Sequence, residues 1–251
     1  MQLLILGGSS EASALARALA ADARFAPMLS LAGRTRAPVL PPIPLRIGGF
    51  GGVAGLAAWL REHRTAAVVN ATHPFAARMS ANAVAACAAT GTKLLRVLRP
   101  EWTPGAGDHW RCVRDMDEAA RALGSAARRV LLTIGRQDLA PFARMPQHDY
   151  VIRSVDAPPD AALPPRATVI SARGPFAEAD EIALLRAHAI DVLVTKNAGG
   201  DATRAKLDAA RALRLPVVMV ARPSPAPGET VPDVAGALAW LDRVHTALLG
   251  V

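Results

Sequence analysis

The stretch that decides the fold is QLLILGGSSEASALARAL, residues 2–19, in which a short apolar run passes through two glycines and two serines into a helical pattern. The run at 2–6 has the length of a buried strand, and the apolar residues after Ser10 recur at helical spacing. A strand, a tight turn and a helix in this order are typical of α/β proteins with a parallel sheet. The sequence therefore predicts strands alternating with helices along the rest of the chain.

This alternation continues to the end of the sequence. In the first part we expect strands at 2–6, 27–31, 44–47, 66–70 and 93–98, and helices at about 10–22, 52–64 and 75–90. In the second part we expect strands at 111–113, 129–134, 149–155, 167–171, 191–195 and 216–221, helices near 115–124, 176–188 and 202–213, and a last helix at 232–249 after a Pro-rich loop. The pattern predicts α/β architecture; the strand order within each sheet stays open.

The stretch RPEWTPGAGDHW, residues 99–110, interrupts the alternation and is the best linker in the chain. We therefore expect two Rossmann-like lobes, each a mostly parallel sheet flanked by helices, with a ligand cleft between them. The first lobe would be residues 1–100 and the second residues 101–251.

Composition narrows the classes of function. The net charge is +8, but the basic residues are scattered, and one Tyr, four Trp and five Phe offer few platforms for stacking bases. An acidic small molecule therefore fits the positive charge better than a nucleic acid does. No apolar run approaches the ~18–20 residues of a membrane span, and MQLLILGGSSE lacks the basic start of a signal peptide, so a cytoplasmic protein without a membrane partner is expected. Cys87 and Cys112 lack ligand spacing, so no metal site is expected.

The first candidate site is the turn after the first strand, because parallel sheets bind ligands beyond the carboxyl ends of their strands. Gly7 and Gly8 allow the backbone to approach a phosphate, while Ser9, Ser10 and Glu11 open a helix whose N-terminus favours anions. The turn departs from G-x-G-x-x-G, so an ordinary tight turn with a serine cap remains an alternative.

The turn after the second strand, AGRTR, carries Arg34, Thr35 and Arg36. Dinucleotide-binding folds that use NAD place an acid here, whereas an arginine accommodates the 2′-phosphate of NADP. Arg34 and Arg36, with Thr35 as a further donor, therefore favour NADPH over NADH. A solvated basic loop is the alternative.

Two further turns belong to the first lobe. In GGFGG, residues 48–52, Gly49 allows close approach of a ligand, and Phe50 is either part of the site or a hydrophobic anchor. In ATHPF, we expect Pro74 in the first turn of a helix that begins at Phe75, with Thr72 as N-cap or ligand donor. His73 would then lie at the mouth of the cleft, to bind phosphate, stack or transfer a proton, unless it only packs or caps.

The second lobe places one cation at each of three strand ends. Arg136 precedes Gln137, Arg173 precedes Gly174, and Lys196 opens the sequence Lys196-Asn197-Ala198-Gly199-Gly200. Three such cations suit a ligand with several carboxylates. Lys196 is one of only three lysines among 29 basic residues, which indicates charge neutralisation or proton donation; pairing with a nearby acid is the alternative.

Two common enzyme classes are excluded by missing motifs. The only tyrosine, Tyr150, has Ser154 where a short-chain dehydrogenase needs lysine four residues later. The G-x-S-x-G motif of a serine hydrolase is absent from the sequence.

Taken in order, these turns resemble the precorrin-6A reductase (precorrin-6x reductase) family of cobalamin biosynthesis. The resemblance rests on LILGGSSEASALARAL, SLAGRT, RIGGFGG, ATHPFAARMSANAVAAC, RPEW, IGRQDL, ARGPF and LVTKNAGG, and THPFA-x-x-MS-x-NA with TKN-x-GG is its most specific part. It implies NADPH-dependent reduction of one double bond of precorrin-6A, giving precorrin-6B. The implied partner is a tetrapyrrole with several carboxylates, which would be handed over to other enzymes of the pathway.

The resemblance also implies roles for the turns. Gly7 to Glu11 match the family's dinucleotide turn, Arg34 and Thr35 its second loop, and the GGFGG and THPF turns complete the nicotinamide side. Two positions depart from the family pattern: Asn70 replaces a common Asp, and Ala198 replaces a common Ser. Motifs do not assign the proton donor, for which His73, Lys196 and a bound water are the candidates.

Two other functions remain open at this point. A non-catalytic NADP-sensing or phosphate-binding regulator explains the first lobe but not the cations of the second. A generic NADPH reductase of a smaller acidic metabolite explains both lobes, though less specifically.

Overall fold

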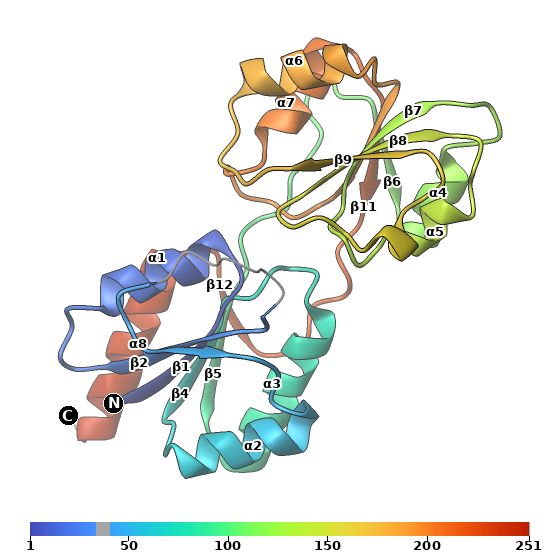
Figure 1. Ribbon diagram of the computed structural model, residues 1–251. Coiled ribbons are helices and arrows are strands. Elements are labelled where there is room, and N and C mark those ends of the chain that lie inside the picture. The colour runs from blue at the N-terminus through green and yellow to red at the C-terminus, as the bar shows by residue number, and fades with distance from the viewer. Residues whose placement is uncertain (34–40, 251) are drawn as a thin grey trace. The chain divides into compact units, whose positions relative to one another are not determined.

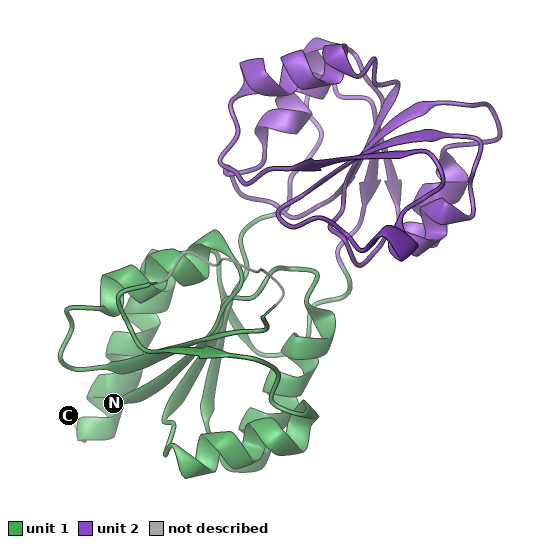
Figure 2. Cartoon of the chain, in the orientation of Figure 1, with its two compact units in different colours: residues 1–100, 223–251 green, residues 101–222 purple. Residues whose placement is uncertain are grey.

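The computed structural model describes residues 1–33 and 41–250, which divide into two compact units (Figure 2). Unit 1 combines residues 1–100 with residues 223–251, and unit 2 is residues 101–222. The predicted second lobe, residues 101–251, is therefore wrong at its C-terminal end, because the chain returns to unit 1 after Arg222.

In unit 1, the described strands form one parallel sheet in the order β12-β5-β4-β1-β2-β3 (Figure 1). This is the doubly wound order of dinucleotide-binding folds, and it places the reversal of strand order between β1 and β4. The elements are β1 (Gln2–Leu6), α1 (Ser10–Leu19), β2 (Ala26–Leu31), β3 (Leu45–Ile47), α2 (Gly52–Glu62), β4 (Ala67–Asn70), α3 (Ala77–Thr90), β5 (Lys93–Val97), β12 (Glu229–Val231) and α8 (Val234–Leu249).

In unit 2, the described strands form a second parallel sheet, in the order β6-β11-β10-β7-β8-β9. It repeats the spatial order of unit 1, with β7 in the place of β1 and β10 in the place of β4, but its edge strand β6 comes first in the sequence. The reversal therefore lies between β7 and β10. The elements are β6 (Trp110–Val113), α4 (Met116–Ala122), β7 (Arg129–Thr133), α5 (Ala140–Ala143), β8 (Asp149–Ser154), η1 (Asp160–Ala162), β9 (Ala167–Ser171), α6 (Glu178–Ala187), β10 (Val192–Lys196), α7 (Ala205–Ala212) and β11 (Val217–Val220).

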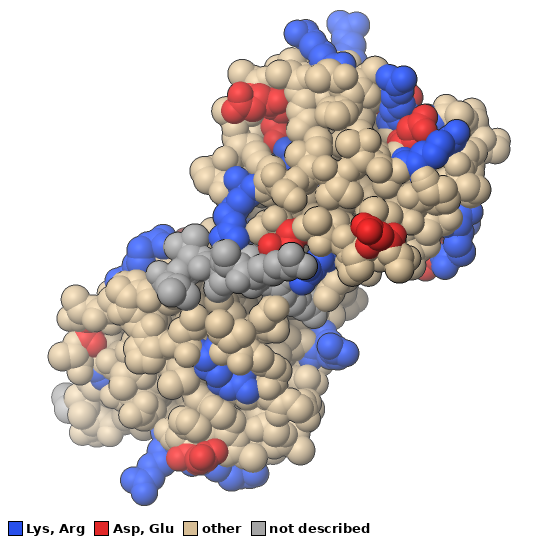
Figure 3. Space-filling model, in the orientation of Figure 1, with Lys and Arg blue, Asp and Glu red and all other residues tan. Residues whose placement is uncertain are grey.

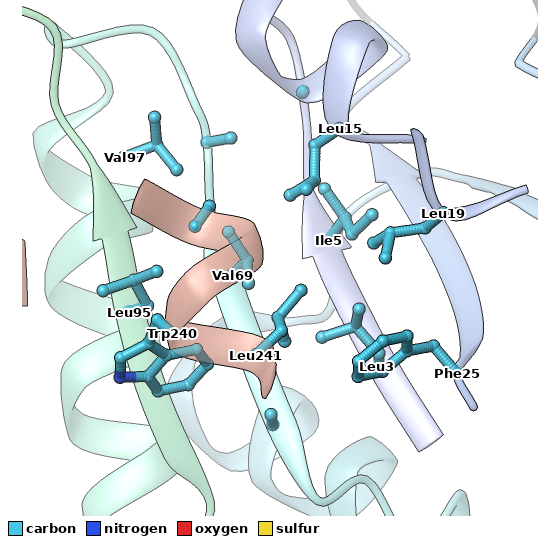
Figure 4. Close-up of a cluster of buried hydrophobic side chains, with 14 of the residues drawn as sticks. Leu3, Ile5, Leu15, Leu19, Phe25, Val69, Leu95, Val97, Trp240 and Leu241 are labelled. Atoms are coloured by element: carbon cyan, nitrogen blue, oxygen red, sulfur yellow. The ribbon is translucent and has the colours of Figure 1, made fainter. Parts of the chain in front are cut away.

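The core of unit 1 follows from the alternation of β1. Leu3 and Ile5 belong to a cluster with α1 and α8, whereas Leu4 and Leu6 belong to a cluster with α2 and α3. Figure 4 shows the first cluster, in which Trp240 and Leu241 of α8 lie beside the strands. A strand covered on both faces must be apolar at every position, which is how residues 3–6 read.

The C-terminal segment contains a strand where the sequence analysis expected only a loop. β12 pairs with β5, the Leu98 N–H donates to the Val231 carbonyl over 2.8 Å, and the indole of Trp240 donates to Glu229 over 2.7 Å. A three-residue edge strand after a Pro-rich stretch has no periodicity of its own, so the sequence does not reveal it. The short helices α5 and η1 were missed for the same reason.

On the face drawn in Figure 3, Lys and Arg side chains are spread over both units and do not gather into one positive patch. Among the described residues, no helix has the length and apolar character needed to cross a membrane.

Candidate active site

The turn after β1 lies at the reversal of strand order in unit 1. Gly8 has a φ of +122° and nothing within 4 Å of the place where a β-carbon would stand, so this left-handed backbone is open on that side. A β-carbon on Gly7 would lie 2.7 Å from Leu29 Cδ1, so the turn packs tightly on its other side. The Ser9 hydroxyl accepts from the Ala12 N–H over 3.2 Å and donates to the Ala71 carbonyl over 2.7 Å. Ser9 thus caps α1 and joins the turns that follow β1 and β4.

Glu11, in the first turn of α1, is engaged by Arg99 at the end of unit 1. One guanidinium nitrogen of Arg99 lies 3.0 and 2.8 Å from the two carboxylate oxygens. Burial by itself raises the pKa of Glu11, but Arg99, the Glu11 backbone N–H and Ser9 together hold it below its usual range. The carboxylate therefore stays ionised and forms an ion pair with Arg99.

The GGFGG turn is shaped by Arg46, which the sequence analysis did not single out. Its guanidinium donates to the carbonyls of Gly48 (2.6 Å) and Gly49 (2.7 Å) and stacks 3.9 Å from the centre of the Phe50 ring. Gly49 remains exposed, and half-buried Phe50 meets Trp59 edge-on. These contacts support Phe50 as the anchor of the turn. Arg34, Thr35 and Arg36, the predicted 2′-phosphate residues, lie outside the described residues.

The THPF turn differs from the prediction. Helix α3 begins at Ala77, and the residues before it form a turn closed by the Ala76 N–H and the His73 carbonyl over 2.8 Å. Pro74 thus occupies the second position of a β-turn, which its fixed φ favours as much as it favours a helix start. Thr72 is not the N-cap of α3, because Ala76 takes that position without a side-chain cap.

Asn70 organises this turn from the buried end of β4. Its carbonyl oxygen accepts from the Thr72 N–H (3.2 Å) and the Thr72 hydroxyl (2.8 Å), while its amide nitrogen donates to the Ser80 hydroxyl over 3.0 Å. The amide accepts with its oxygen and donates with its nitrogen. An ionised carboxylate could only accept, so the Ser80 hydroxyl would have to donate to it instead. The position therefore has a structural task that asparagine performs fully.

The His73 ring accepts a hydrogen bond from the Phe75 N–H at Nδ1, over 3.2 Å. With Nδ1 as the acceptor, the ring carries a proton on Nε2.

In unit 2, Lys196 ends β10 beside Asp138, which follows the neighbouring strand β7. The Lys196 ammonium lies 2.5 Å from the Asp138 carboxylate, and only 15% of the lysine side chain is exposed. Arg136 is half-buried and Gln137 exposed on the same turn, which leaves β7 through Gly135 at a φ of +88°. Lys196, Arg136 and Gln137 therefore follow strands, as predicted, and the structure adds that these two strands flank the reversal of strand order.

Arg173 is placed differently from the other two cations. It is exposed and follows β9, which is the edge strand of the sheet, with β8 between it and β7. The structure thus brings Arg136 and Lys196 to adjacent strand ends and leaves Arg173 two strands away.

Asn197 is committed to contacts with the start of unit 2. Its side-chain oxygen accepts from the Trp102 N–H over 2.9 Å, and its amide nitrogen donates to Glu101 and to the Trp102 carbonyl, both over 3.0 Å. The Trp102 indole donates to the Gly200 carbonyl over 3.0 Å. The Asn197 side chain therefore holds residues 101–102 in place through hydrogen bonds, which is a structural task and not that of a ligand donor.

The remaining atoms of this turn are also held by the protein. Arg222 donates to the carbonyls of Asn197 (2.8 Å) and Ala198 (2.9 Å). Gly199 and Gly200 have φ values of +66° and +76°, which glycine adopts without strain. Ala198 is 8% exposed and belongs to a hydrophobic cluster that includes Trp102, so its side chain has an apolar setting.

Comparison with known proteins identifies the chain. The family model described as precorrin-6x reductase CbiJ/CobK matches residues 2–242. The chain belongs to this family. The chain is 53% identical to a precorrin-6A reductase of Rhodococcus erythropolis, over 96% of this chain and 97% of that protein. A solved structure titled CobK precorrin-6A reductase superposes with a TM-score of 0.92 at 49% identity, over 97% of each chain. A cobalt-precorrin-6A reductase of Salmonella typhimurium is 31% identical, over 89% of this chain and 88% of that protein.

Membership in the precorrin-6x reductase family confirms the resemblance drawn from the strand-end turns. Sequence reasoning nevertheless missed the residues that shape those turns: Arg46, Arg99, Asp138 and Arg222. Arg99 stands in the quoted RPEW, and Arg46 directly precedes the glycine-rich turn, so their positions carried a signal. Asp138 and Arg222 become recognisable only when the strand order is known.

Proposed function

We propose that this chain uses NADPH to reduce one double bond of precorrin-6A, giving precorrin-6B. The observation that carries the proposal is the similarity, over nearly the whole chain, to proteins named precorrin-6A reductase. Such a reductase acts on a tetrapyrrole as an oxidoreductase.

Unit 1 has the features that a dinucleotide requires. The open backbone at Gly8 and the start of α1 at Ser10 lie at the reversal of strand order, where pyrophosphate binds in this fold class. We propose that Gly8, Ser9 and Ser10 hold the pyrophosphate through backbone N–H groups, with Arg34 and Thr35 on the 2′-phosphate. Gly7 contributes to the tight turn, since its N–H donates to the Ser30 carbonyl over 2.9 Å. Bound there, NADPH would supply the hydride.

The THPF turn follows β4, the strand next to β1, and the GGFGG turn follows β3, two strands from β1 on the other side. In the proposal, Gly49 offers its backbone to the cofactor, Phe50 anchors the turn, and Thr72, His73, Pro74 and Phe75 bound the nicotinamide end. The hydrogen bond from the Phe75 N–H to His73 Nδ1 supports a role for His73 in positioning, with Nε2–H as donor.

Unit 2 has the charges that the substrate requires. We propose that Arg136, Arg173 and Lys196 pair with carboxylates of the macrocycle, with Gln137 as a further donor and Gly199 and Gly200 allowing close approach. Asn197 contributes indirectly, by fixing the turn.

Between the two candidate proton donors, the contacts favour Lys196. The Lys196 ammonium lies at the strand ends proposed to bind the macrocycle, whereas His73 Nδ1 accepts from the Phe75 N–H within its own turn. Asp138 orients the lysine in this proposal.

The relatives support a metal-free substrate. The chain is 53% identical to the relative named for precorrin-6A and 31% identical to the relative named for cobalt-precorrin-6A. We therefore expect precorrin-6A to be reduced with a higher kcat/KM than cobalt-precorrin-6A.

The test is to mix the protein with precorrin-6A and either NADPH or NADH, and to follow the tetrapyrrole spectrum. A change that depends on NADPH supports the proposal. Tight NADPH binding without any spectral change would favour an NADP-sensing regulator. Turnover of a smaller acidic metabolite, with precorrin-6A left unchanged, would favour the generic reductase.

A further inference from the structure

The two units are joined by two chain crossings, and one of them is tied to the candidate site of each unit. Residues 99–102, Arg-Pro-Glu-Trp, form this crossing and are called the connector here. On the unit 1 side, Arg99 binds Glu11 in the glycine-rich turn. On the unit 2 side, Glu101 and Trp102 are bound by Asn197.

The unit 1 end of the connector is sensitive to a bound anion. Glu11 places a negative charge in the first turn of α1, where the proposed pyrophosphate would bind. Arg99, whose side chain is 14% exposed, neutralises this charge. A second anion therefore repels Glu11 and attracts Arg99, so anion binding favours the conformation in which Arg99 stays at the turn.

The connector itself is stiff. Pro100 fixes its own φ and restricts the backbone of Arg99 before it, so the direction in which the chain leaves Arg99 is limited. Trp102 is 5% exposed, its indole donates to the Gly200 carbonyl, and the Lys206 ammonium lies 4.7 Å from its ring centre. A change in the position of Arg99 is therefore transmitted along the connector to Trp102, which is buried in unit 2.

The unit 2 end bears directly on the candidate substrate turn. Asn197 follows Lys196 without an intervening residue, and the Ala198 N–H donates to the Lys196 carbonyl over 2.7 Å. The other chain crossing reaches the same turn, since Arg222, the last residue of unit 2, holds the carbonyls of Asn197 and Ala198. The placement of Lys196 thus depends on groups at both ends of unit 2.

We propose that Arg99 and Asn197 are positioning residues that couple the glycine-rich turn of unit 1 to the Lys196–Gly200 turn of unit 2 through the connector. The proposal rests on the proposed function, in which the first turn binds NADPH and the second binds the tetrapyrrole. Cofactor binding then prepares the substrate turn before the substrate arrives.

The direct test measures hydrogen exchange of the Trp102 amide, which donates to Asn197, in the full chain with and without NADPH. We expect saturating NADPH to slow this exchange about fivefold or more, in the usual range of coupling between sites. In Glu11→Gln, which removes the charge that holds Arg99, the protection should be lost even at NADPH concentrations that saturate the variant. NADPH binding with unchanged Trp102 exchange, or with equal protection in Glu11→Gln, would overturn the coupling and leave the reductase proposal standing. Absence of NADPH binding would overturn both.

Reciprocity gives a second test, because coupled sites must affect each other's affinity equally. Asn197→Asp keeps the acceptor for the Trp102 N–H but sets a carboxylate against Glu101, so it should weaken NADPH binding about fivefold although it lies in unit 2. The matched control is Arg166→Gln, which breaks a half-exposed ion pair with Asp149 elsewhere in unit 2 and should leave NADPH affinity unchanged. Unchanged affinity in Asn197→Asp, with intact cooperative unfolding, would contradict the proposal.

Discussion

At the scale of single residues, the pair formed by Lys196 and Asp138 carries the chemistry proposed for unit 2. Sequence reasoning identified Lys196 because the chain otherwise prefers arginine, but it could not find Asp138, which follows a different strand. The alternative of a simple ion pair and the proposed catalytic role are both compatible with this contact, so substitution must separate them.

Lys196→Met should lower kcat/KM for precorrin-6A by about 10²-fold or more, because it removes the proposed proton donor and a carboxylate partner. Lys196→Arg keeps the charge but cannot release a proton at neutral pH, so it should restore KM without restoring kcat. Steady-state kinetics at saturating NADPH measures both. If the arginine variant recovers full kcat, Lys196 only neutralises charge.

A buried histidine in unit 2 predicts a loss of stability in acid. His148 is fully buried, and neither of its ring nitrogens finds a hydrogen-bond partner within the described chain. Burial, with smaller contributions from Arg128 and Arg166, lowers the pKa of His148 below 6.5, outweighing the Gly124 carbonyl and Asp149.

Because its pKa is lower in the folded state, His148 takes up a proton more readily in the unfolded state. Its contribution to stability is therefore complete above pH ~6.5 and is lost as the pH falls below that value. Urea unfolding of unit 2 between neutral and mildly acidic pH should show this loss, and His148→Phe should reduce it. The exposed His109 serves as the control, since His109→Gln should leave the pH dependence unchanged. An identical pH dependence in His148→Phe would refute this assignment.

At the scale of elements, periodicity predicted the long helices and the described strands other than β12 within a few residues, but not the geometry of their ends. The run at 2–6 matches β1 because a buried strand is a continuous apolar run. The run at 167–171 matches β9, a half-exposed edge strand that contains three β-branched residues. The start of α3 was placed two residues early, because proline fits both a helix start and a β-turn. The choice between them depends on Asn70 and Ser80, whose contact is not local in the sequence.

Helix α2 offers a test of how the GGFGG turn is held. A β-carbon on Gly55 would lie 1.7 Å from the Phe50 carbonyl oxygen. The helix therefore packs against the turn at a position where only glycine, which has no side chain, fits. Gly55→Ala should therefore destabilise the protein by about 1–3 kcal/mol, despite the higher helix propensity of alanine. The denaturant midpoint measures this.

The control for Gly55 lies one turn later in the same helix. Ala58 is exposed, so Ala58→Gly should show only the ordinary cost of about 0.5–1 kcal/mol for glycine in a helix. A stabilised Gly55→Ala protein would show that the turn does not depend on this contact.

At the scale of the whole molecule, the sequence predicted two doubly wound units but not where the chain ends belong. The break at residues 99–110 marks the first crossing. The second crossing coincides with the start of the Pro-rich loop at residues 223–232, which the sequence analysis treated only as a loop before the last helix. Only packing shows that α8 completes unit 1, since Trp240 and Leu241 are buried against β1 and its neighbours. The strand orders are likewise set by packing, not by local sequence.

This division predicts how fragments behave. Residues 101–222 should unfold cooperatively as an isolated fragment, because the fragment contains its whole sheet and core. Residues 1–100 alone should not fold stably, because they lack β12 and the apolar face of α8. Circular dichroism and urea unfolding of both fragments would check this. A stable fragment 1–100 would mean that α8 is dispensable.

The central claim, that this chain transfers a hydride from NADPH to precorrin-6A, is tested most directly by isotope transfer. The full chain is incubated with precorrin-6A and NADPH deuterated at both transferable positions of the nicotinamide ring, and the tetrapyrrole product is analysed by mass spectrometry. We predict a reduced macrocycle that carries one carbon-bound deuterium. A reduced macrocycle without deuterium, or oxidation of NADPH with precorrin-6A unchanged, would contradict the account.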